Sequence, residues 1–423
     1  MGMIANLAPA GLTAGRDELG FREWTSARAS NRIADYDLVI LGGGCAGLSL
    51  AMRLAALGTR CPRTLVIEKR SSYTNDRTWC FWGESSKAVE HLIRQRWQRV
   101  TLRDGDRVVA VDCSAMPYQM ITAEAFYEYA LRVISESERI DLATGVVLAS
   151  EPLKIGNEWR VATNQGLFSG AKVVDTRPPP PPQIGAATLW QSFYGCEIET
   201  ECDIFEAGCA ELMHFTPGPA DQVNFNYVLP FSARRALVEA TVFGVEPVGR
   251  GELEGELRDA LHRRTRGVEC RVLRTENGIL PMGGTRPGKA LDATYVKAGL
   301  SAGAGRASTG YAFQRIQRWA DHCAEVLSHG GLPFDHPADP ALLRALDYLF
   351  VSVIRSWPNA APSLFLGLFE KTDTSRMIRF LSDAGTLADC AAVAAALPAG
   401  LFIREIPRAI GRKFGELAGR RGR

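Results

Sequence analysis

The chain has 423 residues, too many for one ordinary hydrophobic core, because single domains mostly contain about 100–200 residues; we therefore expect two or three interleaved domains. Hydrophobic residues make up 46% and charged residues 23%, a composition that is typical of globular proteins and excludes a disordered or fibrous chain. The 49 Lys and Arg nearly balance the 47 Asp and Glu, and this net charge of +2 argues against nucleic acid as a partner.

The ten cysteines form no CxxC pair and no metal-ligand spacing, so we predict reduced thiols, no metal site and a location on the cytoplasmic side. The first 35 residues lack a basic start followed by an unbroken apolar core, so no signal peptide is expected.

No apolar stretch reaches the ~20 residues of a membrane-spanning helix. The longest charge-free stretches near the end, Ser356–Phe369 and Cys390–Ile403, fit either core helices or segments that dip into a membrane. Residues 404–423 carry seven Lys and Arg against two Glu, which fits equally a tail on anionic lipid and a solvated tail.

The first predicted elements form a βαβ unit. Residues 36–41 are a short apolar run that ends in glycines, residues 46–57 have the apolar spacing of a helix, and residues 64–68 form a second apolar run that ends in an acid. The sequence Gly-Gly-Gly-Cys-Ala-Gly stands between the first strand and the helix, and it contains the pattern GxGxxG. In this context the pattern predicts a dinucleotide site.

Each residue of this motif has a physical role in binding a dinucleotide. Gly42 permits the turn, Gly44 lets the backbone approach a pyrophosphate, and Gly47 lets the helix and strand close, while the helix N-terminus favours phosphate charge. Glu68, which follows Gly47 by 21 residues, can accept both hydrogen bonds of an adenosine ribose and repels a 2′-phosphate. The residues therefore predict FAD or NAD, and not NADP.

The next segments complete the first half of this domain. Residues 122–137 begin with a capping threonine and have the pattern of an amphipathic helix, and residues 171–175 form another predicted strand. The five prolines Pro178–Pro182 fix an extended segment, which we interpret as a rigid exit from the first half of the cofactor domain.

The following region is rich in predicted strands. Val223–Phe231 and Ala236–Phe243 are two such runs separated by four residues, and a hairpin is the simplest account. A glycine-rich turn after Val296 opens another helix, and the remainder is predominantly helical.

The choice of FAD over NAD rests on a resemblance. The opening βαβ unit, followed far downstream by Val174-Asp175-Thr-Arg177 and then by Gly299-Leu-Ser-Ala-Gly303, is similar to the split FAD domain of flavin hydroxylases and their relatives. The resemblance implies that Asp175, Gly299 and Gly303 join the four residues above in holding FAD.

It also implies an α/β fold with a doubly wound, Rossmann-type FAD-binding domain, which an interleaved β-rich substrate domain divides in two. The predicted boundaries are 36–182 and 296–330 for the two parts of the FAD-binding domain, 183–295 for the substrate domain and 331–423 for a helical C-terminal region.

Flavin hydroxylases usually carry Gly-Asp where this chain has Gly299-Leu300, and the stretch 299–313 is instead similar to lycopene cyclases. The similarity continues through further segments in the same order: Asp76-Arg-Thr-Trp-Cys-Phe-Trp82, Pro117-Tyr118, Gln191–Thr200, Leu229-Pro-Phe231, Leu237-Val-Glu-Ala-Thr241, Glu276–Met282, Ser363–Phe369 and Phe380-Leu-Ser382. The chain departs from the family's pattern at Cys196, His214, Arg306 and Ala307.

This resemblance implies a lycopene cyclase that forms β-ionone rings on lycopene or a related linear carotene, giving γ-carotene or β-carotene. A proton is delivered to the terminal double bond, the neighbouring alkene attacks, and the ring cation loses a proton, so no net electrons move. The resemblance further implies that FAD is needed in its reduced form, with NAD(P)H as a candidate reductant. We expect peripheral contact with the cytoplasmic face of a membrane.

Glu239 occupies the family's Leu/Val-Glu-x-Thr position, which makes it the predicted catalytic acid. Strand alternation puts it on one face with Leu237 and Phe243. An acid among apolar neighbours has its pKa raised by desolvation, which keeps it protonated and able to donate. From the residues alone, a surface glutamate paired with Arg234 or Arg235 fits the pattern too.

A ring cation also needs stabilisation without a nucleophile that would quench it, and aromatic faces supply about 0.5–2 kcal/mol each when desolvated. For every candidate a plain core position is the alternative. The candidates are Trp79, Phe81, Trp82, Phe193, Tyr194, Phe225 and Tyr227. Two competing functions stay open: an FAD-dependent carotenoid or prenyl hydroxylase or reductase, and a non-catalytic flavin-binding membrane protein.

Overall fold

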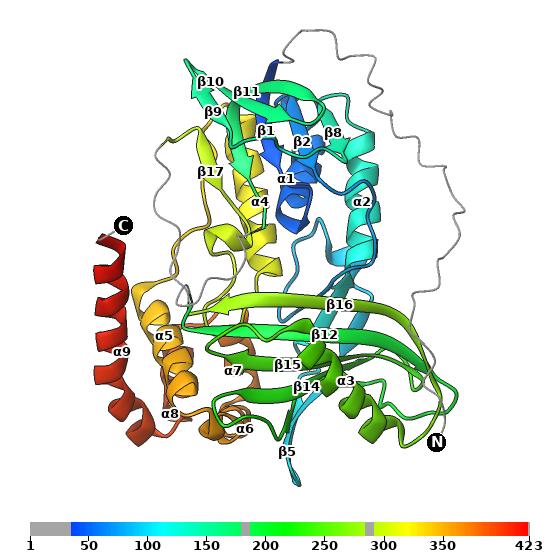
Figure 1. Ribbon diagram of the computed structural model, residues 1–423, viewed down its shortest axis with the longest axis vertical. Coiled ribbons are helices and arrows are strands. Elements are labelled where there is room, and N and C mark those ends of the chain that lie inside the picture. Colours follow the sequence, from blue (N-terminus) through cyan, green and yellow to red (C-terminus); the bar gives the residue numbers. More distant parts are fainter. Residues whose placement is uncertain (1–34, 179–186, 284–291, 422–423) are drawn as a thin grey trace.

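The structure is a computed structural model that describes residues 35–178, 187–283 and 292–421. Two segments with sequence-based predictions lie outside these ranges: the first 34 residues, where no signal peptide is expected, and Pro179–Pro182 of the proline run. The described residues form two sheets of seven strands and one of three, together with a group of C-terminal helices (Figure 1).

The first sheet is the predicted cofactor-type layer. Its strands and the helices beside it are β1 (Asp35–Leu41), α1 (Cys45–Ala55), β2 (Thr64–Glu68), α2 (Ala123–Ser135), β8 (Ile140–Thr144), β9 (Leu153–Ile155), β10 (Glu158–Thr163), β11 (Gly166–Asp175), β17 (Tyr295–Lys297) and α4 (Phe313–Ser328). The strand order is β8-β2-β1-β11, and β17 pairs with the end of β11; these strands are all parallel. The antiparallel strands β10 and β9 extend the sheet beyond β11.

Both faces of this sheet are covered, which explains why its strands are almost continuously apolar. Along β1, Leu38 and Ile40 pack against α1, α2 and α4, while Val39 and Leu41 pack on the other face against β10 and β11. The strand order reverses between β1 and β11, and ligands of such folds bind at this switch point. The predicted α/β, Rossmann-type fold is confirmed, and Thr122 caps α2 as expected by accepting a hydrogen bond from the backbone of Ala125.

The second sheet is larger and mostly antiparallel. Its elements are β5 (Arg99–Asp104), β6 (Arg107–Asp112), β12 (Leu189–Thr200), β13 (Cys209–Thr216), β14 (Val223–Pro230), β15 (Arg235–Gly244), the covering helix α3 (Arg250–Thr265) and β16 (Cys270–Met282). The order is β16-β12-β15-β14-β13-β5-β6, and only β13 and β5 run parallel. The predicted hairpin is β14 and β15. Strands β5 and β6 come from the range 36–182, because the chain crosses to this sheet before it forms α2.

A small sheet joins the two layers. It consists of β3 (Thr78–Phe81), β4 (Gln95–Trp97) and β7 (Tyr118–Thr122), in the order β3-β7-β4. Its strand β3 contacts both neighbours, because Thr78 bonds to Glu276 of the second sheet while Trp79 meets Phe126 of α2 edge-to-face. Alternation along β3 therefore sends successive side chains to different domains.

The chain ends in helices that pack beside the second sheet (Figure 1). They are α5 (Ala341–Ser356), α6 (Ala361–Lys371), α7 (Thr374–Leu381), α8 (Leu387–Ala395) and α9 (Ala399–Arg421). Among the described residues, short 3-10 helices are formed by Gly58–Arg60, Glu90–Leu92, Leu300–Ala302 and Pro358–Ala360. The stretch Ser356–Phe369 is a core segment, since Leu364 and Leu366 of α6 are buried. In the described part of the chain no single helix is long and apolar enough to cross a membrane, and α8 with residues 399–412 passes that test only as a pair bent by 107°.

The departure from the family's pattern at Arg306 has a structural partner. Its side chain is fully buried and forms two bonds of 3.0 Å with the carboxylate of Asp347 on α5. Ser308 donates to the same carboxylate at 2.8 Å, and the guanidinium also donates to the carbonyl of Phe380 at the end of α7. Arg306 thus ties the loop after β17 to the C-terminal helices, and Asp347 compensates its buried charge.

Candidate functional site

The glycine motif lies at the switch point, between the end of β1 and the start of α1. Gly42 has φ +96°, in the left-handed region that favours glycine. A Cβ at Gly47 would overlap the carbonyl oxygen of Gly42, so helix and turn can close only on glycine. A Cβ at Gly44, in contrast, would meet no atom within 4 Å. The first turn of α1 is therefore open where Gly44 stands, as a bound pyrophosphate requires.

Glu68 ends β2 beside this turn. One of its carboxylate oxygens accepts from the backbone of Gly43 at 2.6 Å, and the other accepts from the backbone and the guanidinium of Arg70 at 2.9 Å each. Burial acts to raise the pKa of Glu68, but the bonds from Arg70 and Gly43 outweigh it and lower that pKa. The buried hydroxyl of Tyr73, next to Gly43, has no hydrogen-bond partner among the described residues. An ionised acceptor and an unpartnered hydroxyl fit the ribose of a dinucleotide.

The downstream residues reach the same place. Asp175 ends β11 opposite Leu41 of β1, and its backbone oxygen accepts from Ala298 at 2.9 Å. Gly299 has φ +75° and lies against the first turn of α1, since its Cβ would stand 3.2 Å from that of Ala46. Gly303, at φ +80°, ends the short helix that follows. The structure thus brings the two separated halves of the predicted cofactor site together.

The carboxylate of Asp175 has a supporting place in this site. It accepts from the guanidinium of Arg177 and, at 2.8 Å, from the hydroxyl of Tyr295. Burial acts to raise its pKa, but the bonds from Arg177 and Tyr295 lower it. These bonds hold the strand end and the β17 segment together.

The predicted acid lies in the second sheet. Glu239 of β15 is buried and stands opposite Tyr227 of β14 on one side and Gly195 of β12 on the other. Gly195 in turn stands opposite Glu276 of β16. A Cβ at Gly195 would lie 2.5 Å from Cγ of Glu239, so the glutamate side chain extends over this glycine and reaches a hydrogen bond with Glu276.

The two carboxyls have different surroundings. Glu276 accepts from the hydroxyl of Thr78 at 2.7 Å and from the guanidinium of Arg274. Burial and the charge of Glu276 raise the pKa of Glu239 well above its usual value. This raised pKa favours the protonated, neutral form of Glu239. The surface alternative does not occur, because Arg234 pairs with Asp203 and Arg235 with Glu197.

A group of hydroxyl and thiol side chains lies beside this acid. The hydroxyl of Tyr118 is 2.9 Å from that of Tyr227 and 3.3 Å from that of Tyr311. Cys80 of β3 contacts Tyr227 and Tyr118, and its pKa, like theirs, is raised by burial. Of this group only Tyr227 is predicted from the sequence to line the site. Cys80, Tyr118 and Tyr311 lie in the segments similar to the family, but nothing in their local pattern signals a site.

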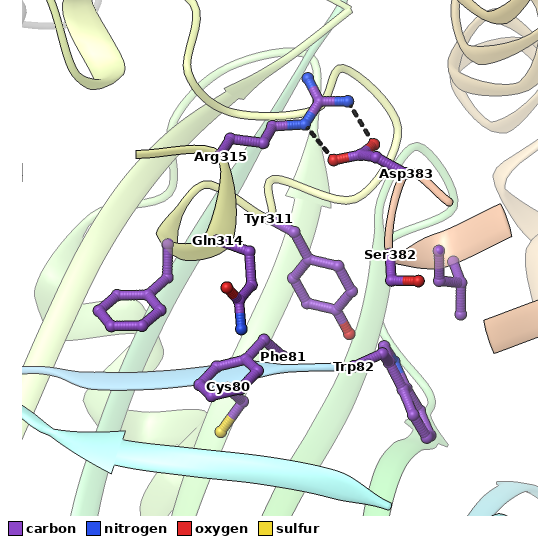
Figure 2. Close-up of a pocket in the computed structure, with 10 residues that line it drawn as sticks. Cys80, Phe81, Trp82, Tyr311, Gln314, Arg315, Ser382 and Asp383 are labelled. Carbon is purple, nitrogen blue, oxygen red and sulfur yellow. Dashed lines mark hydrogen bonds and ion pairs between the residues drawn. The ribbon is translucent and has the colours of Figure 1, made fainter. Parts of the chain in front are cut away.

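Figure 2 shows a narrow pocket next to this group. It is built from β3, from the start of α4 and from the end of α7, and its lining residues are Cys80, Phe81, Trp82, Tyr311, Phe313, Gln314, Arg315, Leu381, Ser382 and Asp383. The ion pair of Arg315 with Asp383, with bonds of 2.8 and 2.5 Å, spans one side of it. The cavity volume of about 20 Å³ holds about one water molecule, so a larger ligand enters only when side chains move.

The predicted aromatic residues divide between different surfaces. Tyr227, Phe193 and Phe225 lie on the face of the sheet that carries Glu239, as the ladder register and the alternation of strands require. Phe81 and Trp82 line the pocket.

Two of the predicted aromatic side chains do not lie beside Glu239. Tyr194 points to the opposite face of β12, where its ring lies under Arg250 of α3 at 5.0 Å. Trp79 points away from the second sheet; it stacks on Phe313 and meets Phe126 edge-to-face, each at 5.3 Å between ring centroids. The physical reason is the same for both, since neighbouring residues on a strand face opposite ways. The sequence-based grouping of these two with Glu239 is therefore corrected.

The remaining departures from the family's pattern lie outside this group. Cys196 is buried in the cluster under α3, on the face opposite Glu239. His214 of β13 pairs in register with Asn226 and lies near Glu211, and burial lowers its pKa. The carbonyl of Ala307 accepts from the backbone of Gly283 at 2.9 Å.

Comparisons with known proteins bear on this geometry. The family model described as "Lycopene cyclase protein" matches residues 37–404. The curated proteins gave no match. Among solved structures, a geranylgeranyl bacteriochlorophyll reductase-like protein from Thermoplasma acidophilum is 11% identical, with 91% of this chain and 100% of that chain covered and a TM-score of 0.56.

Two further solved structures are similar in the same way. The p-nitrophenol 4-monooxygenase PnpA from Pseudomonas putida is 13% identical, with 90% and 98% of the two chains covered and a TM-score of 0.56. The flavin-dependent brominase Bmp2 is 12% identical, with 89% and 100% covered and a TM-score of 0.58. At such identities these likenesses establish a common fold.

Proposed function

The chain belongs to the lycopene cyclase family, and from this premise we propose that it closes β-ionone rings on lycopene or a related linear carotene, without net redox change. The observation that carries the proposal is Glu239, a buried carboxyl that meets Glu276 across Gly195 and lies beside aromatic and tyrosine side chains, where burial and Glu276 raise its pKa. Acid catalysis of this kind needs a proton held ready in a water-poor site, and burial in the second sheet provides it.

FAD is the cofactor that the glycine site fits best within this family. The open turn at Gly44 would take the pyrophosphate, Glu68 the adenosine ribose, and Gly299 and Gly303 the downstream part of the molecule. When bound in its reduced form, FAD would supply negative charge that stabilises a developing cation. NAD(P)H is the candidate reductant.

The steps of the reaction follow from the chain's own residues. Glu239 gives its proton to the terminal double bond, and the neighbouring alkene attacks the cation so that a carbon–carbon bond closes the ring. The ring cation then loses a proton from an adjacent carbon, which we assign to the Glu239 carboxylate; the acid is thereby restored. Atoms and electrons balance, and the product is an isomer of the substrate.

The side chains around the acid protect the cation. The faces of Phe193 and Trp82 can stabilise positive charge by cation–π attraction. Burial raises the pKa of Tyr118 and of Tyr227, so both stay neutral phenols, which are far weaker nucleophiles than phenolates. A cation formed here therefore survives long enough to lose its proton.

Product mass tests the proposed reaction against its competitors. Purified protein with reduced FAD and lycopene in detergent should give cyclic products of unchanged mass, separated from lycopene by chromatography. A gain of about 16 Da would mean oxygenation, and a change of about 2 Da reduction or desaturation; either result would replace the cyclase with the redox enzyme. No product with fully flavin-loaded protein would favour the non-catalytic flavin-binding protein.

We also propose peripheral contact with the cytoplasmic face of a membrane, through α9. Ile403, Ile406 and Ile410 are 65%, 43% and 50% exposed, and their spacing of three and four residues places them on one stripe of the helix. Arg404 and Arg408 are exposed beside that stripe. An apolar stripe with a basic flank fits the interface of an anionic membrane, where lycopene is dissolved.

A further inference from the structure

We propose that Glu276 is a positioning residue, which keeps the proton on Glu239 and makes the two carboxyls a pair that shares one proton. The inference rests on the proposed function and adds a second acidic residue to it. The local sequence around Glu276 does not indicate this role. The register of β15, β12 and β16 does.

The geometry of the pair depends on the strand that separates the two residues. Glu239 and Glu276 stand on β15 and β16, and β12 runs between these strands. Both glutamates are opposite the same residue, Gly195, so both side chains emerge on the same face. Since Gly195 has no side chain, the carboxyls meet above it; a Cβ there would stand 2.5 Å from Cγ of Glu239.

The hydrogen bonds decide which member of the pair carries the proton. Ionisation of two carboxyls that are in contact and shielded from water is strongly unfavourable, so the resting pair keeps one proton. Glu276 already accepts from Thr78 and from Arg274, and a carboxylate accepts such bonds better than a carboxylic acid. Arg274 is fixed in turn by a bond of 2.7 Å to Glu197. The proton therefore resides on Glu239, which donates to Glu276.

The other titratable groups around Glu239 do not act in place of Glu276 to keep the proton on Glu239. Cys80 of β3 and Tyr227 of β14 face it, and Tyr118 of β7 bonds to Tyr227; burial raises the pKa of each, so all three are neutral at pH 7. Tyr311, in the loop before α4, is neutral for the same reason. Glu197 of β12 is paired with two arginines.

The charged groups that act on Glu239 are therefore Glu276, which favours its protonation, and Arg274, which opposes it. Glu276 also helps to complete the catalytic cycle. When Glu239 has given its proton to the alkene, two carboxylates face one another at the site, which is unfavourable. Return of a proton to Glu239 relieves that repulsion. The pair thereby sets the upper limit of the pH range in which the acid is loaded.

The test is an infrared titration of the purified protein, together with the pH profile of cyclisation. The band of the protonated carboxyl, identified by its loss in Glu239→Gln, should persist at neutral pH in the wild type. In Glu276→Gln, which keeps the shape but removes the charge, the band should disappear at a pH lower by about one unit or more. The alkaline limb of cyclase activity should move in the same direction.

Controls separate this role from a structural one. Glu276→Asp keeps the charge and should keep the alkaline limb near its wild-type position. Glu199→Gln removes an exposed glutamate on β12 that pairs with Arg271, and it should move neither the band nor the limb. An unchanged titration in Glu276→Gln overturns the proposal. Absence of the protonated-carboxyl band from the wild-type protein at neutral pH overturns it too, and this second result is decisive even if the variant fails to fold. The infrared measurement needs no substrate, so it tests the carboxyl pair separately from the proposed function. The pair can be shown in a protein that forms no rings, and ring formation can be shown in a protein whose titration contradicts the pair.

Discussion

Glu239 and Glu276 stand on strands that are not neighbours, and they meet across Gly195 of the strand between them. Glycine weakens the interior of a strand, because it adds no packing and costs conformational entropy. Here its missing side chain is what lets two acids share a hydrogen bond. In the proposed reaction, the second sheet would therefore provide the acid and the residue that tunes it, while the first sheet would provide the cofactor turn.

Glu239→Gln should keep the fold and the cofactor but lose cyclisation. An amide matches the carboxyl in shape, yet it cannot donate a proton to an alkene, and general acid catalysis supplies about 10²–10⁴-fold in rate. Initial rates of ring formation by flavin-loaded protein measure the effect, with Glu199→Gln as a control on the same sheet. A variant that keeps more than about a tenth of the activity would show that another group is the acid.

Gly44→Val should give a folded protein that retains no flavin. Its side chain would enter space that is open in the structure, so the fold is not disturbed, but a pyrophosphate could no longer approach the helix. Absorbance of bound flavin and circular dichroism measure the two effects. Gly208→Val, in a turn where a Cβ also meets no atom within 4 Å, is the matched control and should stay yellow. A yellow, fully loaded Gly44→Val protein would contradict the site.

Glu68→Gln should lose flavin affinity and also change how stability depends on pH. The pKa of Glu68 is lower in the folded chain than its usual value, so its carboxylate stabilises the fold above about pH 4.3, and this contribution is lost as pH falls through the folded-state pKa. The free energy of unfolding, measured in urea without added flavin, should therefore differ most between wild type and variant near neutral pH. Curves that stay parallel into acid would mean that the Arg70 and Gly43 bonds do not stabilise the ionised form.

Ile403→Glu should weaken binding to vesicles that contain anionic lipid. The substitution puts a charge at the start of the exposed stripe of α9, on its most exposed residue, and this charge would have to leave water on docking. Leu153→Glu is the matched control, because Leu153 is 63% exposed on β9, in a different part of the molecule (Figure 1). Flotation with vesicles of varied charge measures both. Equal binding of the two variants, or a change of oligomeric state in place of vesicle binding, would assign the stripe to another partner.

The cofactor half of the molecule could be predicted closely because its signals are local. The strand, the glycine turn, the helix and the acid at the end of β2 lie within 34 consecutive positions, 35–68, and each residue acts on its near neighbours. The hairpin of β14 and β15 and the cap of α2 are local in the same sense. No comparable signal exists for Arg306, whose partner Asp347 is 41 residues away.

The acid site could be predicted only in part, because it depends on register between distant strands. The position of Glu239 on its strand was predictable, but its contact with Glu276 requires β16 to pair with β12 at one register. For the aromatic residues, the sequence predicts too many members of the site. Composition marks Trp79 and Tyr194 as candidates, and only the orientation of each strand reveals that both point away from Glu239.

Electron use distinguishes the cyclase from the redox enzymes most sharply. Ring closure moves no net electrons, so flavin-loaded enzyme that is reduced once with dithionite under anaerobic conditions should perform many ring closures without further reductant. In deuterated water, each ring should gain about one deuterium, because the proton that Glu239 takes from the ring exchanges with solvent between turnovers, and the deuteron that replaces it stays on the carbon that it attacks. Mass spectrometry of the product and titration of the remaining reductant measure the two quantities. Enzyme without reduced flavin should form no rings in the same mixture. Stoichiometric consumption of reductant, or rings without deuterium, would remove acid-catalysed cyclisation and leave a hydroxylase or reductase, whose chemistry consumes electrons at every turnover.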